Sequence, residues 1–353
     1  SSLKMVGEGG EFVRGFFIPF LLVCGMRRVL HVGPCDTPGG MATVMHTLAE
    51  FPPEGWEAEL LASHAPGGLW AKWRAYRRAR HELKRRCSDP ALRPDVVHVH
   101  TAADWSWRRK ARLIRIAQLH AVPITLHIHS GQFHDWLDAG GPRRKKSVRA
   151  TLEQKNIAAV VLSRHWVKIL NPALGELMHV PNPVVVPVFD DEVIRKKNQM
   201  LLLGRNDPVK GHDFAMEVAG ILNKKLGNVS LIMTGKEGES KAYIQEKGWL
   251  SEAEKQQLLR ESSVLLVPSL FEGQPMVVLE ALAHGLPVLA SEQLHSLPTS
   301  VQFVPRNITD WVNFLEAFFE SSTLQSSATL PDEHKIEHVA EQWRMVYDHL
   351  LNS

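Results

Sequence analysis

The stretch PSLFEGQPMVVLEALAHGLPVLAS, residues 268–291, decides the fold class. It begins where an apolar, β-branched run ends, passes through a short polar turn, and continues as an apolar helical pattern that stops near Gly285. A second short apolar run follows at once. Strand, helix and strand in such close succession are typical of a parallel sheet. The same stretch places two carboxylates, Glu272 and Glu280, on either side of the helix start.

Runs of the same kind recur along the chain. They occupy residues 27–32, 57–62, 95–100, 123–129 and 158–163, and then residues 199–204, 229–235, 263–269 and 286–291. Longer helical patterns separate them, as parallel strands require. The sequence therefore predicts two doubly wound α/β domains, over residues 26–188 and 189–330, joined by a Pro- and Val-rich linker. Residues 331–353 form an amphipathic helix whose apolar face is Ile336, Val339, Trp343, Val346 and Leu350.

The composition is that of a globular protein. Of the 353 residues 44% are hydrophobic and 22% charged, which argues against disorder. Three widely spaced cysteines, Cys24, Cys35 and Cys87, favour neither a disulfide framework nor a zinc cluster and fit a reducing cytoplasm.

Residues 1–25 precede a natural-looking start at Met26. We treat them as an N-terminal extension, either introduced by cloning or belonging to an upstream start, with an interfacial anchor as the alternative. Their longest apolar run, residues 16–24, is interrupted by Pro19 and is shorter than the roughly 20 residues that a membrane-spanning helix needs.

Positive charge is concentrated in the N-terminal half. Between Trp70 and Ala150 the chain has 19 Lys or Arg against 6 Asp or Glu. Residues 69–86, LWAKWRAYRRARHELKRR, mix these cations with aromatic side chains close to helical spacing. Such a segment is either a solvated helix face or a surface that contacts anionic lipid. Nucleic-acid binding is disfavoured because no recognition motif accompanies the cations.

Two fixed cations follow the first strand of the C-terminal domain. In LLLGRNDPVKGHDF, residues 201–214, a buried run ends at Gly204, and Arg205 and Lys210 precede the next helical pattern. Cations at a strand end beside a helix N-terminus suit an anion. A diphosphate is the natural occupant because Arg binds two oxygens while Lys neutralises a third. Two surface cations in a turn are the alternative explanation.

Glu272 and Glu280 both lie near the start of one helix. Pro275 fits the first helical turn and Glu280 lies about one turn farther on, so both carboxylates can face a ligand lying across the helix start. Carboxylates accept hydrogen bonds from hydroxyls such as those of a sugar nucleotide. A helix-dipole partner plus an exposed glutamate is the purely structural alternative.

Two further strand ends carry unusual residues. In PITLHIHSGQF, residues 123–133, His127 and His129 lie on one side of a buried strand, and no third metal ligand is evident in the sequence. Hydrogen bonding to a substrate is therefore preferred over a metal site. In HVGPCDTPGGMATV, residues 31–44, the three-glycine spacing of the dinucleotide-binding fingerprint is absent. Gly39 and Gly40 nevertheless permit close approach of the backbone to a ligand.

Taken in order, these motifs resemble those of the retaining glycosyltransferases of family 4, part of the glycosyl transferases group 1. The resemblance runs from Met26 to about Leu351, and its most specific parts are GRNDPVKG and the stretch quoted first. DVVHVH, TLHIHSG, VLS and VPNPV fit the same family in the same order. The resemblance implies the GT-B architecture, in which two Rossmann-like domains face each other and the C-terminal helix returns to the N-terminal domain.

The resemblance also implies roles for the matching residues. Arg205 and Lys210 would bind the donor diphosphate and stabilise the leaving nucleotide. Glu280 would hold the ribose, Glu272 would face the transferred sugar, and His127 would lie near the reacting carbon. The other implied donor contacts are Gly39, Gly40, Gly204, Gly273, Gln274, Pro275, Met276 and Val277, and further candidates are His129, Ser163, Asn182 and Leu250.

The implied activity is retaining, metal-independent transfer of a sugar from a nucleotide-diphosphate donor to a glycan or lipid-linked acceptor, in surface polysaccharide or glycolipid biosynthesis. No cofactor is expected, and a UDP-sugar is favoured over a GDP-sugar. We expect a cytoplasmic protein with peripheral contact to the inner face of an anionic membrane. The alternatives are a non-catalytic GT-B scaffold and a sugar-nucleotide epimerase of the same architecture.

Two features depart from the family pattern. The connection after residues 229–235 is short, so we expect a helix to be missing there and residues 241–248 to form a strand. Gln274 and Pro275 stand where other members often carry an aromatic residue and a glycine, which removes one backbone donor near the sugar. The donor sugar, the base, the acceptor and the oligomeric state stay open.

Overall fold

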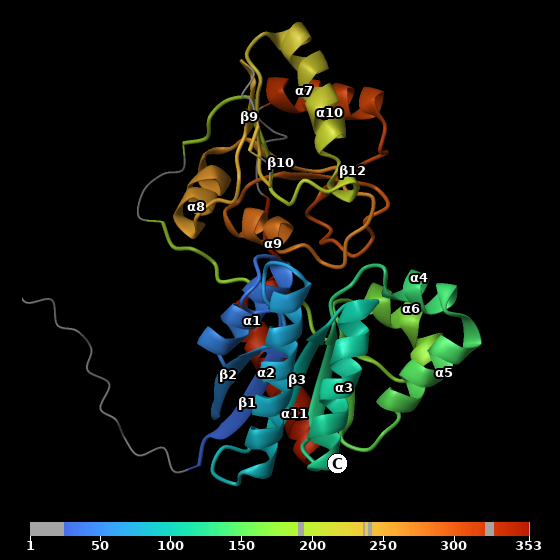
Figure 1. Ribbon diagram of the computed structural model, residues 1–353. Coiled ribbons are helices and arrows are strands. Elements are labelled where there is room, and N and C mark those ends of the chain that lie inside the picture. The colour runs from blue at the N-terminus through green and yellow to red at the C-terminus, as the bar shows by residue number, and fades with distance from the viewer. Residues whose placement is uncertain (1–24, 190–193, 236, 239–241, 322–327, 353) are drawn as a thin grey trace, which may run out of the picture.

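The structure is a computed structural model that describes residues 25–189, 194–235, 237–238, 242–321 and 328–352. The predicted N-terminal extension and its suggested anchor, Gly25 excepted, lie outside these residues. Two α/β domains lie one above the other in Figure 1, each built on one parallel sheet. None of the helices in the described ranges has the length and apolar character that crossing a membrane would require.

The N-terminal domain contains a six-stranded sheet in the order β2-β1-β3-β4-β5-β6. Its strands are β1 (Arg27–Gly33), β2 (Trp56–Ala62), β3 (Val96–Thr101), β4 (Ile124–Ile128), β5 (Ile157–Val161) and β6 (Met178–His179). The helices between them are α1 (Gly40–Glu50), α2 (Leu69–Ser88), α3 (Trp105–Leu119), α4 (Phe133–Ala139), α5 (Gly141–Leu152) and α6 (Arg164–Leu174). All strand pairs are parallel, as the alternation of strand and helix patterns predicts.

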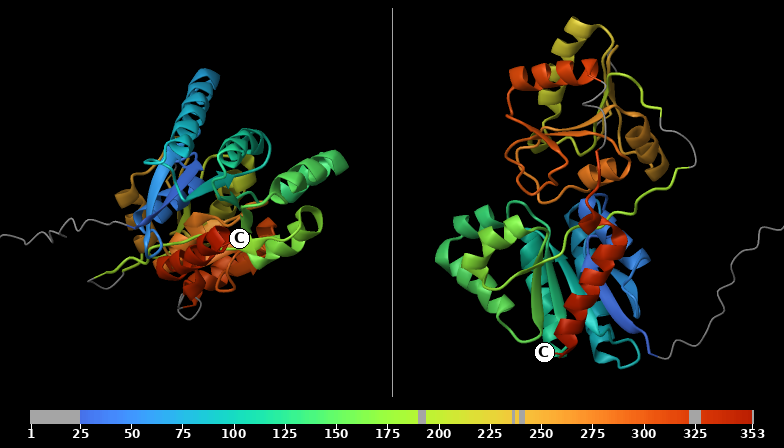
Figure 2. Two further views of the ribbon diagram at one scale, coloured as in Figure 1. Left: turned by 90° about the horizontal axis from the view of Figure 1, so that it is seen from below. Right: turned by 180° about the vertical axis from the view of Figure 1, so that it is seen from behind.

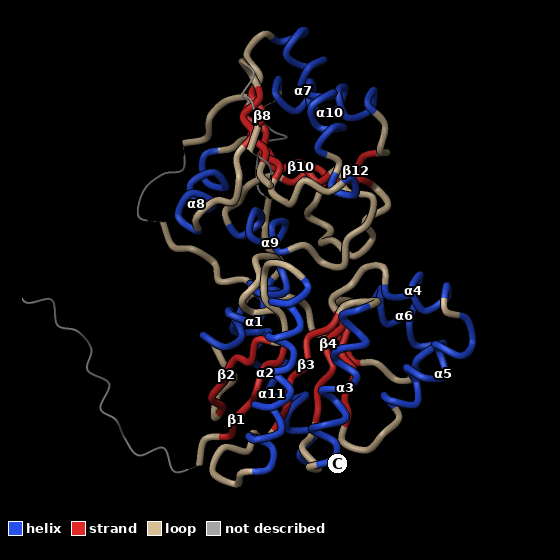
Figure 3. Tube along the Cα trace, viewed as in Figure 1, coloured by secondary structure: helices blue, strands red, loops and turns tan. Residues whose placement is uncertain are grey.

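The C-terminal domain repeats this plan with the strand order β12-β11-β10-β7-β8-β9. Its strands are β7 (Gln199–Leu202), β8 (Ser230–Met233), β9 (Ile244–Glu246), β10 (Val264–Val267), β11 (Val288–Ser291) and β12 (Gln302–Val304). Its helices are α7 (His212–Leu226), α8 (Glu252–Glu261), α9 (Met276–Ala283) and α10 (Ile308–Glu320), with a short 3-10 turn at Pro208–Lys210. Figure 3 shows both sheets enclosed by helices.

All nine predicted strands are present: β1 and β2 are one residue longer than expected, β3 is shifted by one residue, and the other six are shorter. The strand expected within residues 241–248 is confirmed as β9, and the described residues between β8 and α8 form no helix. The short strands β6 and β12 were not predicted from the pattern. Each has no more than three residues, which is too short for a period to be recognised.

The final helix, α11 (Ile336–Asn352), leaves the second domain and packs on the first sheet. Figure 2 shows it from behind, lying across that sheet on the face opposite α2 and α3. Its predicted apolar face is confirmed, since all five residues are at most 4% exposed: Ile336, Val339, Trp343, Val346 and Leu350. A bridge between Val184 and Lys335 ties the interdomain connection to the start of this helix.

Each face of the first sheet has its own core. One core packs against α2, α3, α5 and α6, whereas the other packs against α1 and α11 and continues into the second domain. On β3, Val97 and Val99 belong to the first core. His98 and His100 alternate with them and point to the α11 side, where the His98 ring contacts Trp343 at 4.3 Å between centroids. The strand period therefore directs histidines to the face that α11 covers.

Candidate active site

A cavity of about 700 Å³ lies between the two domains, at the carboxyl ends of strands from both sheets. Both domains contribute to its wall. Most of the predicted site residues line it: Gly39, Gly40, His129, Asn182, Gly204, Arg205, Lys210, Leu250, Glu272, Gly273, Gln274, Pro275, Met276, Val277 and Glu280. Residues that are distant in sequence are thus brought to one cavity. The starts of α1 and α9 touch beside it, since an added Cβ at Gly40 would lie 3.5 Å from Met276 Cγ.

The predicted diphosphate residues lie on the second domain's side of the cavity. Lys210 ends the 3-10 turn, and its stem packs over Gly204, where an added Cβ would lie 3.6 Å from the Lys210 Cδ. Its ammonium group lies 2.5 Å from Glu272 Oε1, and the Ser269 hydroxyl donates to the same oxygen at 2.8 Å. Arg205 is exposed and forms no ion pair with any residue in the described ranges. One cation is therefore paired with a carboxylate and the other is open to the cavity.

Glu280 is the most buried carboxylate of the site. It is 6% exposed, and its Oε1 accepts a hydrogen bond from Lys255 Nζ at 2.9 Å. Its Oε2 is buried without a hydrogen-bond partner among the described residues. Burial raises the pKa of Glu280, although Lys255 acts in the opposite direction. A buried acceptor that lacks a donor is suited to bind a ligand hydroxyl.

Close backbone contacts join the domains beside the cavity. An added Cβ at Gly131 would lie 2.3 Å from the Glu272 carbonyl oxygen, and one at Gly273 would lie 2.3 Å from the His129 carbonyl oxygen. The Trp166 indole donates to the Gly273 carbonyl at 3.2 Å. Glycine is therefore required at both positions because no other residue permits this approach.

Asn182 and Gln274 form a second link between the domains. The Asn182 amide N–H donates to Gln274 Oε1 at 2.7 Å, and its side chain donates to the Gln274 carbonyl at 2.9 Å. His334, just before α11, bonds the Asn182 carbonyl at 3.0 Å. Gln274 thus orders the interdomain connection.

The two predicted histidines have different positions. Their rings are neighbours on one side of β4, 4.0 Å apart between centroids, as expected. His129 lines the cavity, whereas His127 is 0% exposed and does not belong to the described lining residues. The prediction that His127 belongs to the site therefore needs correction: β4 ends one residue after His127, so the next residue on that face, His129, reaches the cavity and His127 does not.

Ser163 also lies away from the described cavity wall. It is the N-cap of α6, and its hydroxyl accepts from the Trp166 amide at 3.4 Å. Its neighbour Leu162 lines the cavity instead. The motif that pointed to Ser163 therefore marks a helix start, in agreement with the preference of serine for that position.

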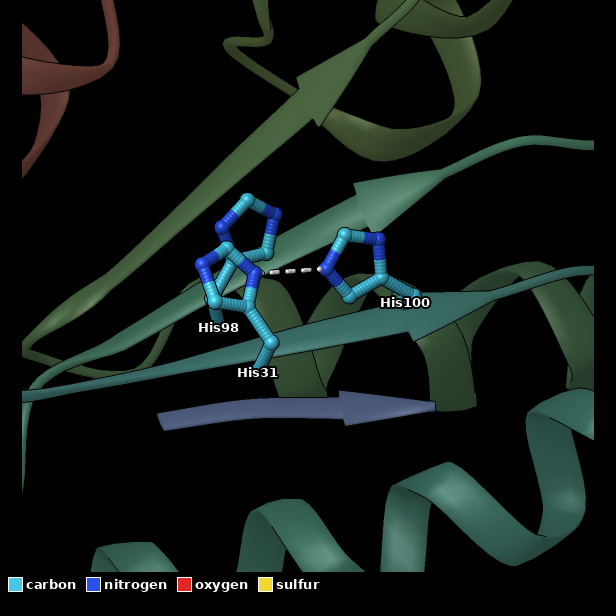
Figure 4. A group of neighbouring side chains, drawn as sticks. All are labelled: His31, His98 and His100. Carbon is cyan, nitrogen blue, oxygen red and sulfur yellow. Dashed lines mark hydrogen bonds between the residues drawn. The ribbon is translucent and has the colours of Figure 1, made fainter. Parts of the chain in front are cut away.

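Four buried histidines, His31, His98, His100 and His127, form a network with the half-buried His129. His31 Nδ1 lies 3.0 Å from His100 Nε2, and His100 Nδ1 lies 2.9 Å from His129 Nε2. In a second chain, His98 bonds the Tyr347 hydroxyl at 2.7 Å and His127 at 3.3 Å. Figure 4 shows the contact between His31 and His100, with His98 beside them.

Burial keeps these imidazoles neutral. It lowers the pKa of His31 and of His129 to about 3, and it lowers the pKa values of His98, His100 and His127 further below their usual range. A neutral imidazole has one donor and one acceptor, so a chain of such rings is satisfied when the tautomers alternate. The first chain ends at the cavity, where it fixes the orientation of His129.

Among the described residues, two groups of these histidine rings could hold a metal ion. One nitrogen each of His31, His98 and His100 lies within 4.8 Å of the others, and His100, His127 and His129 form a second such group. The third ligand that the sequence did not reveal is therefore present. No described carboxylate belongs to either group, so a divalent cation would be buried without a counter-charge. Hydrogen bonding between neutral rings explains the cluster without a metal.

Several residues of the site were not singled out from the sequence. His98 and His100 carry a usable signal, because histidine alternates with apolar residues on β3 as it does on β4, and His31 lies between apolar residues on β1. Lys255 carries none, since its contact with Glu280 depends on how α8 packs beside α9. Lys110 and Arg109 lie within the cation-rich residues 70–150, and the pattern alone could not distinguish them from solvated cations.

The comparison with known families concerns the second domain. Residues 197–310 match the model of the family described as Glycosyl transferases group 1. The glycogen synthase of Mycobacterium tuberculosis is 25% identical over 260 residues, which cover 65% of this chain and 61% of that protein. The chain thus spans less than two thirds of that relative. These matches support sugar transfer and leave the substrates unspecified.

Solved structures resemble the whole architecture. Sucrose-phosphate synthase from Thermosynechococcus elongatus superposes with a TM-score of 0.65 at 13% identity, over 92% of this chain and 99% of that one. Anabaena HepE in complex with UDP superposes with a TM-score of 0.64 at 10% identity, over 91% and 100%. At such identities the likeness concerns the fold, and the predicted GT-B fold is confirmed.

Proposed function

We propose that this protein is a retaining, metal-independent glycosyltransferase that uses a nucleotide-diphosphate sugar and a glycan or lipid-linked acceptor. The observation that carries the proposal is the interdomain cavity, in which Arg205, Lys210, Glu272 and Glu280 of one domain face His129 of the other. The match of residues 197–310 to group 1 glycosyltransferases agrees with a donor site on the second domain.

The donor diphosphate would bind between Arg205 and Lys210. Cleavage of the bond between the sugar carbon and the diphosphate oxygen leaves negative charge on the leaving group as the sugar becomes oxocarbenium-like. Two cations fixed beside that oxygen would stabilise the charge more in the transition state than in the bound donor. The chain would need no metal for this step, because side chains supply the counter-charge.

The hydroxyl groups of the donor would bind the two glutamates. The free, buried Oε2 of Glu280 accepts one hydroxyl of a ribose, and Lys255 holds the other carboxylate oxygen in place. Glu272 lies next to Lys210 and would face the transferred sugar. A UDP-sugar is favoured over a GDP-sugar, and the UDP complex of the structurally similar HepE supports that choice.

The acceptor would enter from the first domain, past His129 and the Gly39–Gly40 turn. In a retaining reaction the acceptor oxygen attacks from the side that the leaving group occupied, so a donor phosphate oxygen is placed to take the acceptor proton. His129 is held by His100 at 2.9 Å and would position the reacting sugar. The product would be a glycan or glycolipid of a cell surface.

We also propose peripheral contact with an anionic membrane. Trp70 is 75% exposed and Trp73 47% exposed on α2, a helix rich in cations. Exposed tryptophans among cations suit a lipid surface. The fraction of protein that sediments with liposomes should increase with their content of anionic lipid. A fraction that does not depend on lipid charge would remove this part of the proposal.

The test is release of nucleoside diphosphate from a panel of UDP-, GDP-, ADP- and TDP-sugars, with and without EDTA. One donor should be turned over, the chelator should not abolish turnover, and Arg205→Ala should lower the rate by roughly 100-fold. Lys224→Ala, an exposed cation at the end of α7, is the matched control and should retain the rate. Nuclear magnetic resonance of the product reports the anomeric configuration. Binding of a nucleotide without any turnover would favour the scaffold instead.

A further inference from the structure

A group of basic residues lies beside the cavity on the first domain, away from the proposed donor residues. Lys72 is on the first turn of α2, Arg109 and Lys110 are on the second turn of α3, and His64 follows β2. We refer to these four residues as the cation cluster. They lie at the carboxyl ends of β1, β2 and β3, and Thr37 and Ala102 from the same sheet edge line the cavity. The cation cluster is therefore next to the acceptor side of the proposed active site.

Lys110 is the most buried member. It is 2% exposed, and its ammonium group donates to the Ser63 hydroxyl, which in turn donates to the carbonyl of Gly33 at 3.0 Å. Burial and the nearby Arg109 lower the pKa of Lys110 to about 7. A lysine that is buried against a neutral hydroxyl is unfavourable unless an anion compensates its charge.

Polar atoms around the cluster are also unpaired. Arg109 Nε, His64 Nδ1, the Tyr76 hydroxyl and Thr37 Oγ1 are each buried without a hydrogen-bond partner among the described residues. Buried polar groups are normally hydrogen-bonded, and such exceptions require an explanation. Arg109 interacts electrostatically with both Tyr76 and Lys110. A guanidinium, a hydroxyl and an ammonium group that neighbour one another can all donate to one oxyanion.

Charge balance leads to the same conclusion. Among the residues that the structure describes, no carboxylate forms an ion pair with Lys72, Arg109 or Lys110. The cations instead act on one another: burial and then Arg109, Lys72 and Lys110 lower the pKa of His64. Like charges gathered at a cavity edge repel each other when no described carboxylate pairs with them, so the arrangement favours binding of an external anion.

We propose that the cation cluster binds a phosphate group of the acceptor. This inference rests on the proposed transferase function and names the chemistry of its acceptor. A phosphate offers several oxygens to the ammonium, guanidinium and hydroxyl donors at once. The phosphate belongs either to a soluble sugar phosphate or to a lipid phosphate. Trp105, 69% exposed at the start of α3, is an apolar neighbour for either a sugar ring or a lipid chain.

The experiment measures binding of inorganic phosphate and of glycerol phosphate by calorimetry, with the donor site either free or saturated with UDP. Both probes should bind, and UDP should not displace them. Arg109→Gln and Lys110→Met should each weaken binding at least roughly ten-fold, the effect of losing one charge-assisted hydrogen bond. Arg115→Gln, an exposed arginine on the same helix, should not change it. Lys110→Met keeps the side-chain length and provides an independent test if Arg109→Gln fails to fold.

A second arm uses phosphatidylcholine vesicles with and without a prenyl phosphate. Retention that needs the prenyl phosphate and is lost in Arg109→Gln assigns the site to a lipid phosphate, whereas binding of the soluble probes alone assigns it to a soluble one. Equal binding by Arg109→Gln and Arg115→Gln, or no binding of any probe, overturns the inference. A protein that binds UDP but no phosphate overturns this inference alone, and one that binds phosphate but no nucleotide overturns the proposed function alone.

Discussion

Lys210 Nζ and Glu272 Oε1 lie 2.5 Å apart, so the cation assigned to the donor diphosphate is bonded to the carboxylate assigned to the transferred sugar. Both side chains are partly buried, with exposed fractions of 25% and 12%. A diphosphate that binds Lys210 has to compete with this contact or join it. The ion pair therefore couples the two halves of the proposed donor site.

Glu272→Gln should separate binding from turnover. Without the carboxylate charge, Lys210 is free for the diphosphate, so UDP should bind about five-fold more tightly, which corresponds to ~1 kcal/mol for a partly buried pair. Release of UDP from the donor sugar should fall at least roughly ten-fold, because the transferred sugar loses the carboxylate that accepts hydrogen bonds from its hydroxyl groups. Calorimetry and the release assay measure the two effects. Glu292→Gln, an exposed glutamate of the same domain, should change neither. Weaker UDP binding in Glu272→Gln would contradict this account.

Lys255→Met should destabilise the second domain. It leaves Glu280 buried with no counter-charge, and breaking a buried pair by removing one partner costs about 3 kcal/mol. Urea unfolding measures this loss. The double variant Lys255→Met with Glu280→Gln should lose less than the sum of the single variants, because the uncompensated charge is gone. Purely additive losses would mean that the contact of 2.9 Å is energetically irrelevant.

Gly131→Ala should disturb the closure of the two domains. The new methyl group would lie 2.3 Å from the Glu272 carbonyl oxygen, so the loops have to move apart. We expect a loss of about 1–3 kcal/mol in stability and of roughly ten-fold in donor turnover. Gly68→Ala is the control, since no heavy atom lies within 4 Å of its added Cβ. Equal behaviour of the two variants in urea unfolding and in the release assay would show that the close approach is unimportant.

The buried histidines should make the protein sensitive to acid. Their pKa values are lowered in the folded state, to about 3 for His31 and His129, so between that pKa and the ordinary histidine pKa of about 6.5 only the unfolded chain binds the protons. The free energy of unfolding that depends on these histidines being neutral is fully present above about pH 6.5, and it is lost as the pH falls toward 3. Each ring should contribute about 1.4 kcal/mol per pH unit within this window.

Urea unfolding at about pH 7.5 and about pH 5.5 measures this slope. His31→Gln should reduce the slope of the unfolding free energy against pH by the contribution of one proton, whatever the substitution does to the stability at neutral pH. His338→Gln replaces an exposed histidine of α11 and should leave the slope unchanged. A stability that does not change between the two pH values would mean that the histidines are not buried as described.

The sequence predicts the architecture because its signals are local. Apolar runs of strand length, helical patterns between them and the amphipathic tail each depend on neighbouring residues, and they correctly indicate two parallel sheets and the returning α11. The donor side of the site is equally accessible, since Arg205, Lys210, Glu272 and Glu280 follow strand ends of one domain. Parallel topology then brings those ends to one edge.

Contacts between distant segments could not be predicted in the same way. His127 and His129 differ by one strand repeat, and only the point at which β4 ends decides which of them reaches the cavity. Lys255 depends on the packing of α8 beside α9. Lys110 belongs to a basic helix, and its burial follows from the packing of α3 on the sheet rather than from its sequence neighbours.

The most direct test of the central claim is calorimetric titration of the wild-type chain and of Arg205→Ala with UDP, GDP, ADP and TDP, with Lys224→Ala as the control. The account predicts that one diphosphate, UDP first among them, binds the wild type and Lys224→Ala alike and binds Arg205→Ala at least roughly ten-fold more weakly. If no nucleoside diphosphate binds the wild type, or if Arg205→Ala binds as well as the wild type does, the cavity is not a donor site and the account is contradicted.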